Sequence, residues 1–158
     1  GAEVTAAASD PAKLEAATEG GADACRLLDR SAPDLSALKG ACDLVFDPVG
    51  GAAVQPALKT LRRGGRYLVI GFVAGAPVAV PTNLALLKEI EILGVRAGEA
   101  GWQEPELGRR ALAEIDRIAG AGRFRPIVGL EVPFARAPDA FRAMQAGSLV
   151  GKAIIAMD

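Results

Sequence analysis

The stretch "LVFDPVGG", residues 44–51, runs from three apolar residues directly into Asp47, Pro48 and a pair of glycines. An apolar run of this kind is typical of a strand buried in a sheet, and a helical pattern of apolar residues begins directly after the glycines. A turn that only reverses the chain rarely needs an acid, a proline and two glycines. Since glycine lets another group approach the backbone closely, the turn is expected either to be a helix start capped by Asp47 or to contact a ligand.

Strand-like and helix-like stretches alternate on both sides of this turn. Asp10 is placed to cap a helix that begins at Pro11, and the helix through 54–61 is expected to close over Arg62, Arg63 and Gly64, a cation-then-glycine order typical of helix ends. The expected extended stretches are 3–9, 24–28, 43–47, 65–72, 90–96, 126–134 and 152–157, and the remaining expected helices are 33–40, 82–89, 104–119 and 136–147.

The order of these elements predicts the fold class. Apolar strands separated by helices indicate an α/β fold with a parallel sheet covered on both faces. Such open sheets bind ligands at the carboxyl ends of their strands. Three turns are expected at that edge, "AAASDPAK" (6–13), "LVFDPVGG" (44–51) and "VIGFVAG" (69–75), where they would form the floor of a ligand crevice.

Composition excludes several classes of protein. The chain has 158 residues, is 51% hydrophobic and carries a net charge of -1, so it has enough apolar residues for a core and lacks the basic field of a nucleic-acid binder. A membrane span would need a run of about 18 or more apolar residues, and none occurs. The first ten residues do not resemble a signal peptide. We therefore expect a soluble, cytoplasmic protein with no nucleic-acid partner and no membrane span.

The chain contains no histidine. Zinc sites built on imidazole, Ser-His-Asp triads and histidine general bases are therefore excluded for these 158 residues, and we assign neither a metal site nor a catalytic residue. Cys25 and Cys42 are far apart in the sequence and are expected to be buried thiols. Tyr67 is expected in the core, and Trp102 in a glycine-rich loop.

The turn at 6–13 bears on the choice of nucleotide. A strand that binds NAD usually ends in an acid that accepts from the ribose hydroxyls, but here the strand ends at Ser9, and Lys13 follows one turn into the helix. A hydroxyl and an ammonium at this place suit a 2'-phosphate; the alternative is a solvated surface lysine. No G-x-G-x-x-G motif occurs in the sequence. The stretch "GAGRFR" (120–125) has the first two glycines, but it lacks the third and follows a helix instead of a strand.

Six segments together resemble the medium-chain dehydrogenase/reductase superfamily, and within it the zinc-free NADPH:quinone oxidoreductase branch. The resemblance implies an incomplete Rossmann-like, doubly wound parallel sheet without its first strand and glycine-rich turn. Residues 1–125 would be a truncated dinucleotide-binding domain, and 126–158 a tail that returns to a catalytic domain in a parent enzyme. The segments are "GAEVTAAASDPAKLEAATEGGAD" (1–23), "DLVFDPVGG" (43–51), "LRRGGRYLVIGF" (61–72), "NLALLKEIEILGV" (83–95), "GRFRPIV" (122–128) and "GKAIIAM" (151–157).

The resemblance also implies a function. The chain would be the cofactor-binding portion of an enzyme that transfers hydride from NADPH to a quinone or activated alkene without a metal, and the isolated chain is expected to be inactive. By position, the resemblance implies that Ser9 and Lys13 meet the 2'-phosphate and that Asp47, Val49 and Gly50 lie along the adenosine and its ribose. Gly71 and Phe72 would lie beside the nicotinamide, with Gly94 and Val95 behind it. The tail would bring Lys152 near the cofactor.

Two other classes of function fit parts of the sequence. A non-catalytic nucleotide-binding or assembly module would use the same α/β sheet without chemistry, and a methyltransferase-like sheet also places an acid at a strand end. Nothing in 65–72 or the tail is needed for methyl transfer, which disfavours the methyltransferase-like sheet.

The missing first strand also predicts how the chain associates. In the strand order 3-2-1-4-5-6 this strand lies between 3–9 and 43–47, so its absence exposes the edges of both. We therefore expect a homo-oligomer formed through exposed strand edges; the alternatives are direct pairing of the two edges or local disorder of the first two strands.

Overall fold

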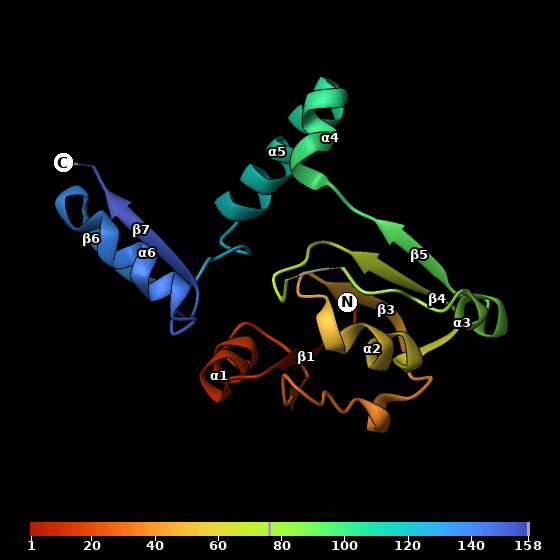
Figure 1. Ribbon diagram of the computed structural model, residues 1–158. Coiled ribbons are helices and arrows are strands. Elements are labelled where there is room, and N and C mark those ends of the chain that lie inside the picture. The colour runs from red at the N-terminus through yellow and green to blue at the C-terminus, as the bar shows by residue number, and fades with distance from the viewer. Residues whose placement is uncertain (76, 158) are drawn as a thin grey trace. The chain divides into compact units, whose positions relative to one another are not determined.

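A computed structural model describes residues 1–75 and 77–157. It divides into two compact units: a central unit, Leu28–Pro105, and a terminal unit made of Gly1–Leu27 together with Glu106–Asp158. Figure 1 shows the elements of both. Every strand pair in the described part of the chain is parallel, as the alternation of strands and helices predicted.

The central unit is built on a three-stranded sheet. Its strands are β3 (Cys42–Asp47), β4 (Leu61–Val69) and β5 (Glu91–Gly94), in the order β3-β4-β5. The helices that connect them are α2 (Val54–Thr60) and α3 (Thr82–Lys88), each in the crossover position that parallel strands require. The unit also contains the 3₁₀ turns η1 (Ser36–Leu38) and η2 (Gly51–Ala53) and the helix α4 (Ala97–Gln103).

The terminal unit contains two further parallel pairs. Asp10 caps α1 (Pro11–Glu19) by accepting from the backbone N–H of Ala12 at 2.9 Å, and Pro11 opens the helix, as the sequence predicted. The other elements are β1 (Thr5–Ala8), β2 (Ala24–Leu27), α5 (Pro105–Gly120), β6 (Val128–Pro133), η3 (Phe134–Arg136), α6 (Ala137–Gln145) and β7 (Lys152–Ala156), with β1 paired to β2 and β6 to β7.

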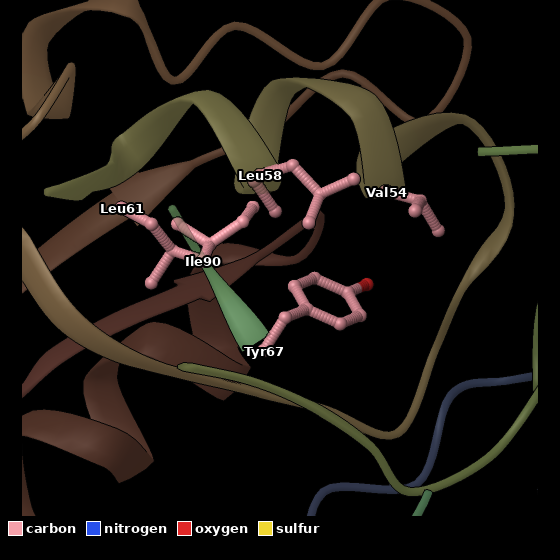
Figure 2. Close-up of a cluster of buried hydrophobic side chains, with 6 residues drawn as sticks. Val54, Leu58, Leu61, Tyr67 and Ile90 are labelled. Carbon is pink, nitrogen blue, oxygen red and sulfur yellow. The ribbon is translucent and has the colours of Figure 1, made fainter. Parts of the chain in front are cut away.

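The core of the central unit lies between α2 and one face of the sheet. Leu58 and Leu61 are completely buried and Tyr67 is 3% exposed. Figure 2 shows Leu58, Leu61 and Ile90 gathered with the Tyr67 ring beneath α2. Residues of α3 pack against the same cluster, so both crossover helices cover one face.

The opposite face of this sheet carries exposed apolar side chains. Side chains alternate along β3, so Leu44 and Phe46 point away from the core; they are 47% and 65% exposed. The expectation that both faces are covered is therefore not met in the central unit taken by itself, because α2 and α3 pack on the same side.

Three local expectations were wrong. The helix after the glycines ends at Thr60, not at Gly64, because Leu61 already has extended backbone angles and begins β4. The register shifts between Cys42, which pairs with Leu61, and Leu44, which pairs with Arg66, so residues 62–65 bulge from the strand. The predicted helix at 33–40 is only the short η1, and residues 97–103 form α4 instead of a loop.

β1 and β3 are among the strands that end a sheet within the described ranges. β1 pairs only with β2, and β3 pairs only with β4, so each presents one edge without a strand neighbour there. This is the condition on which the predicted association through strand edges depends, and that association stays a prediction. Among residues 1–75 and 77–157, no helix combines the length and the apolar character needed to cross a bilayer.

Candidate functional site

The turn after β3 is fixed by its own acid. The Oδ1 atom of Asp47 accepts from the backbone N–H of Val49 at 2.7 Å and of Gly50 at 2.9 Å. Gly50 has φ 70° and ψ -147°, a conformation that is essentially restricted to glycine. The glycine therefore has a backbone reason. Asp47 holds this turn, but the expectation that it caps the following helix was wrong, because the N-caps of η2 and α2 are Gly50 and Ala53 and neither has a side-chain cap bond.

The turns after β3 and β4 are bonded to each other through their backbones. Ile70 donates to the carbonyl of Asp47 at 2.9 Å, and Ala74 donates to that of Val49 at 2.8 Å. A Cβ at Gly71 would lie 3.1 Å from the carbonyl oxygen of Pro48, so a larger residue there would push the turns apart. The two turns, residues 47–51 and 70–75, thus form one continuous surface, which we call the wall.

A small pocket opens against this wall. Its volume is about 70 Å³, which is room for a few water molecules and not for a nucleotide. A ligand would therefore have to lie across the glycine turns at the mouth of the pocket, where Phe72 is 51% exposed. The pocket is lined mostly by apolar residues, with Asp47 and Tyr67 as the polar members; the others are Gly50, Gly51, Val54, Leu58, Val69, Gly71, Phe72, Val78, Val80 and Ile92.

Tyr67 joins the core to this wall. Its hydroxyl donates a hydrogen bond to Oδ2 of Asp47. Burial raises the pKa of Tyr67 well above its ordinary range, and the hydrogen bond and charge of Asp47 raise it further. The hydroxyl is thus a donor at all physiological pH values. The sequence placed Tyr67 correctly in the core but did not show this bond.

A third strand end lies beside the first two. Gly94 pairs with Val69 in the register of β4 and β5, and the N–H of Val95 donates to the carbonyl of Val69 at 3.0 Å. A Cβ at Gly94 would meet no atom within 4 Å, so the space beside it is open. The central unit therefore brings together seven predicted cofactor residues on three neighbouring strand ends: Asp47, Val49, Gly50, Gly71, Phe72, Gly94 and Val95.

The other three predicted residues belong to the terminal unit. Ser9 directly precedes the cap of α1. Lys13 lies in the first turn of that helix, half-buried, with its Nζ 3.4 Å from the carbonyl oxygen of Gly147. Lys152 begins β7 and is exposed. Their roles toward a cofactor stay predictions.

The two cysteines and Trp102 are not part of this wall. Cys25 and Cys42 are free and half-buried, less enclosed than expected, and the Cys25 thiol lies 3.2 Å from the hydroxyl of Thr18. Trp102 lies on α4, not in a loop, and is 88% exposed. Its position gives it no role in the core.

Parallel strands joined by helices, with glycine turns gathered at their carboxyl ends, define a Rossmann-like cofactor-binding domain. The chain matches the model of the zinc-binding dehydrogenase family over residues 1–114 and belongs to that family. It corresponds to the C-terminal, cofactor-binding portion of medium-chain dehydrogenase/reductase enzymes.

The similar proteins include oxidoreductases with different names. Quinone oxidoreductase-like protein 2 of Bos taurus is 29% identical over 160 residues, which cover 99% of this chain and 46% of that protein. The quinone oxidoreductase of Thermus thermophilus, solved also as a complex with NADPH, is 33% identical with a TM-score of 0.78, covering 94% of this chain and 48% of that one.

A third similar structure is a putative alcohol dehydrogenase from Sinorhizobium meliloti 1021. It is 30% identical with a TM-score of 0.77, and the match covers 100% of this chain and 42% of that one. The chain thus spans less than half the length of these relatives. Together the matches relate the chain to the cofactor-binding domain of oxidoreductases and dehydrogenases.

Zinc, which gives the family its name, needs ligands that the described residues do not supply. In the part of the chain that the structure describes, no group of three or more Cys, Asp or Glu side chains could hold a metal ion, and the sequence has no histidine. Structural and catalytic zinc sites take at least three such protein ligands. The described residues therefore do not fit zinc.

Proposed function

We propose that this chain is the cofactor-binding portion of an oxidoreductase that uses NADPH to reduce a quinone or an activated alkene. The observation that carries the proposal is the wall of two glycine turns, in which Gly50 has a glycine-only conformation and Gly71 has no room for a side chain toward Pro48. A backbone that is bare of side chains and held by hydrogen bonds allows a flat or sugar-like group to approach closely. The likeness to quinone oxidoreductases supports the substrate class.

Each residue of the wall has a distinct task in this proposal. Val49 and Gly50 would contact the adenosine and its ribose, while Gly71 and Phe72 would lie beside the nicotinamide. Gly94 and Val95, on the next strand, would close the space behind that ring. When bound, NADPH supplies the hydride, and the protein supplies orientation and exclusion of water.

The choice of NADPH rests on the turn before α1. β1 ends at Ala8 and is followed by Ser9, the next residue Asp10 caps α1, and Lys13 lies in the first turn of this helix of nine residues. We assign the 2'-phosphate to Ser9 and Lys13, and Lys152 to the neighbourhood of the cofactor. A phosphate would replace the long 3.4 Å contact between Lys13 and a neutral carbonyl by a charge-assisted bond.

Catalysis is proposed for a parent enzyme and not for these 158 residues alone. No histidine and no G-x-G-x-x-G cradle occurs in the sequence, and no residue of it is assigned a catalytic role. Orientation of the substrate against the cofactor supplies much of the rate in such transfers, and the proposal assigns that task to residues outside this chain. Rapid NADPH oxidation by the purified chain with a simple quinone would contradict this.

The proposal predicts that NADPH binds more tightly than NADH. A well-formed charge-assisted phosphate contact contributes roughly 1.5–3 kcal/mol, which corresponds to about tenfold or more in Kd. Isothermal titration calorimetry with both cofactors measures the preference. Lys13→Glu is expected to remove it, whereas Lys39→Glu, the same charge change at an exposed lysine outside the site, is expected to keep it. Equal affinities of the wild type for the two cofactors would remove the phosphate assignment.

A further inference from the structure

The carboxylate of Asp47 connects the core to the ligand wall. Oδ1 accepts from the N–H groups of Val49 and Gly50, and Oδ2 accepts from the hydroxyl of Tyr67. Tyr67 is the single tyrosine of the chain, and it is 3% exposed. Its hydrogen bond therefore links a core side chain directly to the turn after β3.

The tyrosine hydroxyl has little freedom to move. Its ring is packed in the cluster with Leu58, Leu61 and Ile90, and Figure 2 shows the hydroxyl oxygen at the end of the ring on the side of Val54. A donor held in this way fixes one oxygen of Asp47 in space. The other oxygen is then held where it can accept from the two backbone amides.

The amides in turn hold the conformation of the wall. Gly50 follows directly in the glycine-only region, and its N–H is one of the two that Asp47 accepts from. Without a fixed acceptor, the turn has no side chain that maintains this conformation. Packing alone does not replace it, because the side chains of Pro48 and Val49 are exposed.

We propose that Tyr67 is a positioning residue for the dinucleotide, acting through Asp47 on the backbone of Val49 and Gly50. This inference rests on the proposed function, since it assumes that the wall binds NADPH. It makes the affinity for the cofactor depend on one buried hydroxyl that does not touch the cofactor.

Tyr67→Phe tests the inference because it removes the hydroxyl and keeps the ring. We expect the Kd for NADPH to rise roughly tenfold, the order expected for loss of a hydrogen bond to a charged group. Hydrogen exchange at the amides of Val49 and Gly50 should become faster without cofactor, while exchange in the rest of β4 stays unchanged. A role in packing alone would not move these two amides.

Thr60→Val is the matched control. Thr60 is also buried, at 2% exposed, and its hydroxyl donates at 2.7 Å to the carbonyl of Ala57 within α2, away from the wall. It is expected to change the Kd for NADPH by no more than about twofold, since its bond does not reach the turn. Equal rises in Kd for both variants would show a general effect of core hydroxyls and would overturn the inference.

Substitutions of Asp47 provide a rescue test. Asp47→Asn keeps an oxygen for the two amides and an NH₂ group that Tyr67 can accept from, so most of the affinity should remain; Asp47→Ala should lose at least as much as Tyr67→Phe. Unchanged exchange at Val49 and Gly50 in Tyr67→Phe would refute the inference alone. A wild type that binds no dinucleotide would instead refute the proposed function, and with it the role of Tyr67 in binding.

Discussion

Replacing Leu58 by alanine is expected to destabilise the central unit by about 2–5 kcal/mol, the range found when a large side chain is removed from a packed core. Leu58 is completely buried between α2 and the sheet, in a cluster with only five other buried residues. Because small domains are stabilised by only about 5–15 kcal/mol in total, this loss is a large fraction of the stability. Urea unfolding followed by far-ultraviolet circular dichroism measures it.

The control for this experiment is Leu86→Ala. Leu86 lies on α3 in the same unit but is 77% exposed, so its truncation leaves no cavity. The expected change in the free energy of unfolding is within about 0.5 kcal/mol, as for most surface substitutions. If Leu58→Ala and Leu86→Ala had equal effects, the core would not be where the structure places it.

Gly50→Ala is expected to combine a loss of stability with a loss of cofactor binding. With φ 70° and ψ -147°, residue 50 occupies a region that costs a residue with a Cβ about 1–3 kcal/mol. The added methyl group itself would find room, at 3.5 Å from the carbonyl oxygen of Gly71 and from the Phe72 ring. The variant is therefore expected to relax its backbone and reshape the wall, with NADPH affinity falling beyond the reach of calorimetry.

Gly64→Ala separates strain from function. Gly64 also has a positive φ, 73°, and a Cβ there would meet no atom within 4 Å, but it lies in the bulge at the start of β4 and not in the wall. We expect this variant to lose stability through backbone strain and to bind NADPH like the wild type. A Gly50→Ala protein that retained wild-type affinity for NADPH would show that the turn does not contact the cofactor.

Much of the fold is predictable because its signals are local. Asp10 and Pro11 mark the start of α1 by capping and by a fixed φ, and the apolar run before Asp47 marks β3, all within a few residues. The errors arise where contacts between residues far apart in the sequence determine the secondary structure. Leu61 continues the helical pattern of α2, yet pairing with Cys42 in the sheet draws it into β4.

The helix at 97–103 shows the reverse case. Gly98 and Gly101 lower helix propensity, which favoured a loop, but the segment forms α4 with an ion pair between Arg96 and Glu99 at its start. A surface ion pair of this kind contributes little by itself. The residues of the segment that favour a helix are the alanines at 97 and 100 together with Glu99 and Gln103.

The site was predictable in part. The glycines at 50 and 71 indicate close backbone approach from the sequence alone, and the structure gives each a physical reason. Predicting the bond between Tyr67 and Asp47 requires the register of β4 against β3. Tyr67 pairs with Val45, which lies two residues before Asp47 on the same face of β3. A sequence does not contain that register, so Tyr67 was recognised as core and not as a connection to the wall.

The central claim is that NADPH binds across the turns after β3 and β4. Amide hydrogen exchange with and without saturating NADPH, read by mass spectrometry, tests it most directly. We expect slower exchange with NADPH in peptides covering 46–53 and 69–75, and unchanged exchange in α6, residues 137–145. Binding of NADPH without protection of either turn would contradict the account.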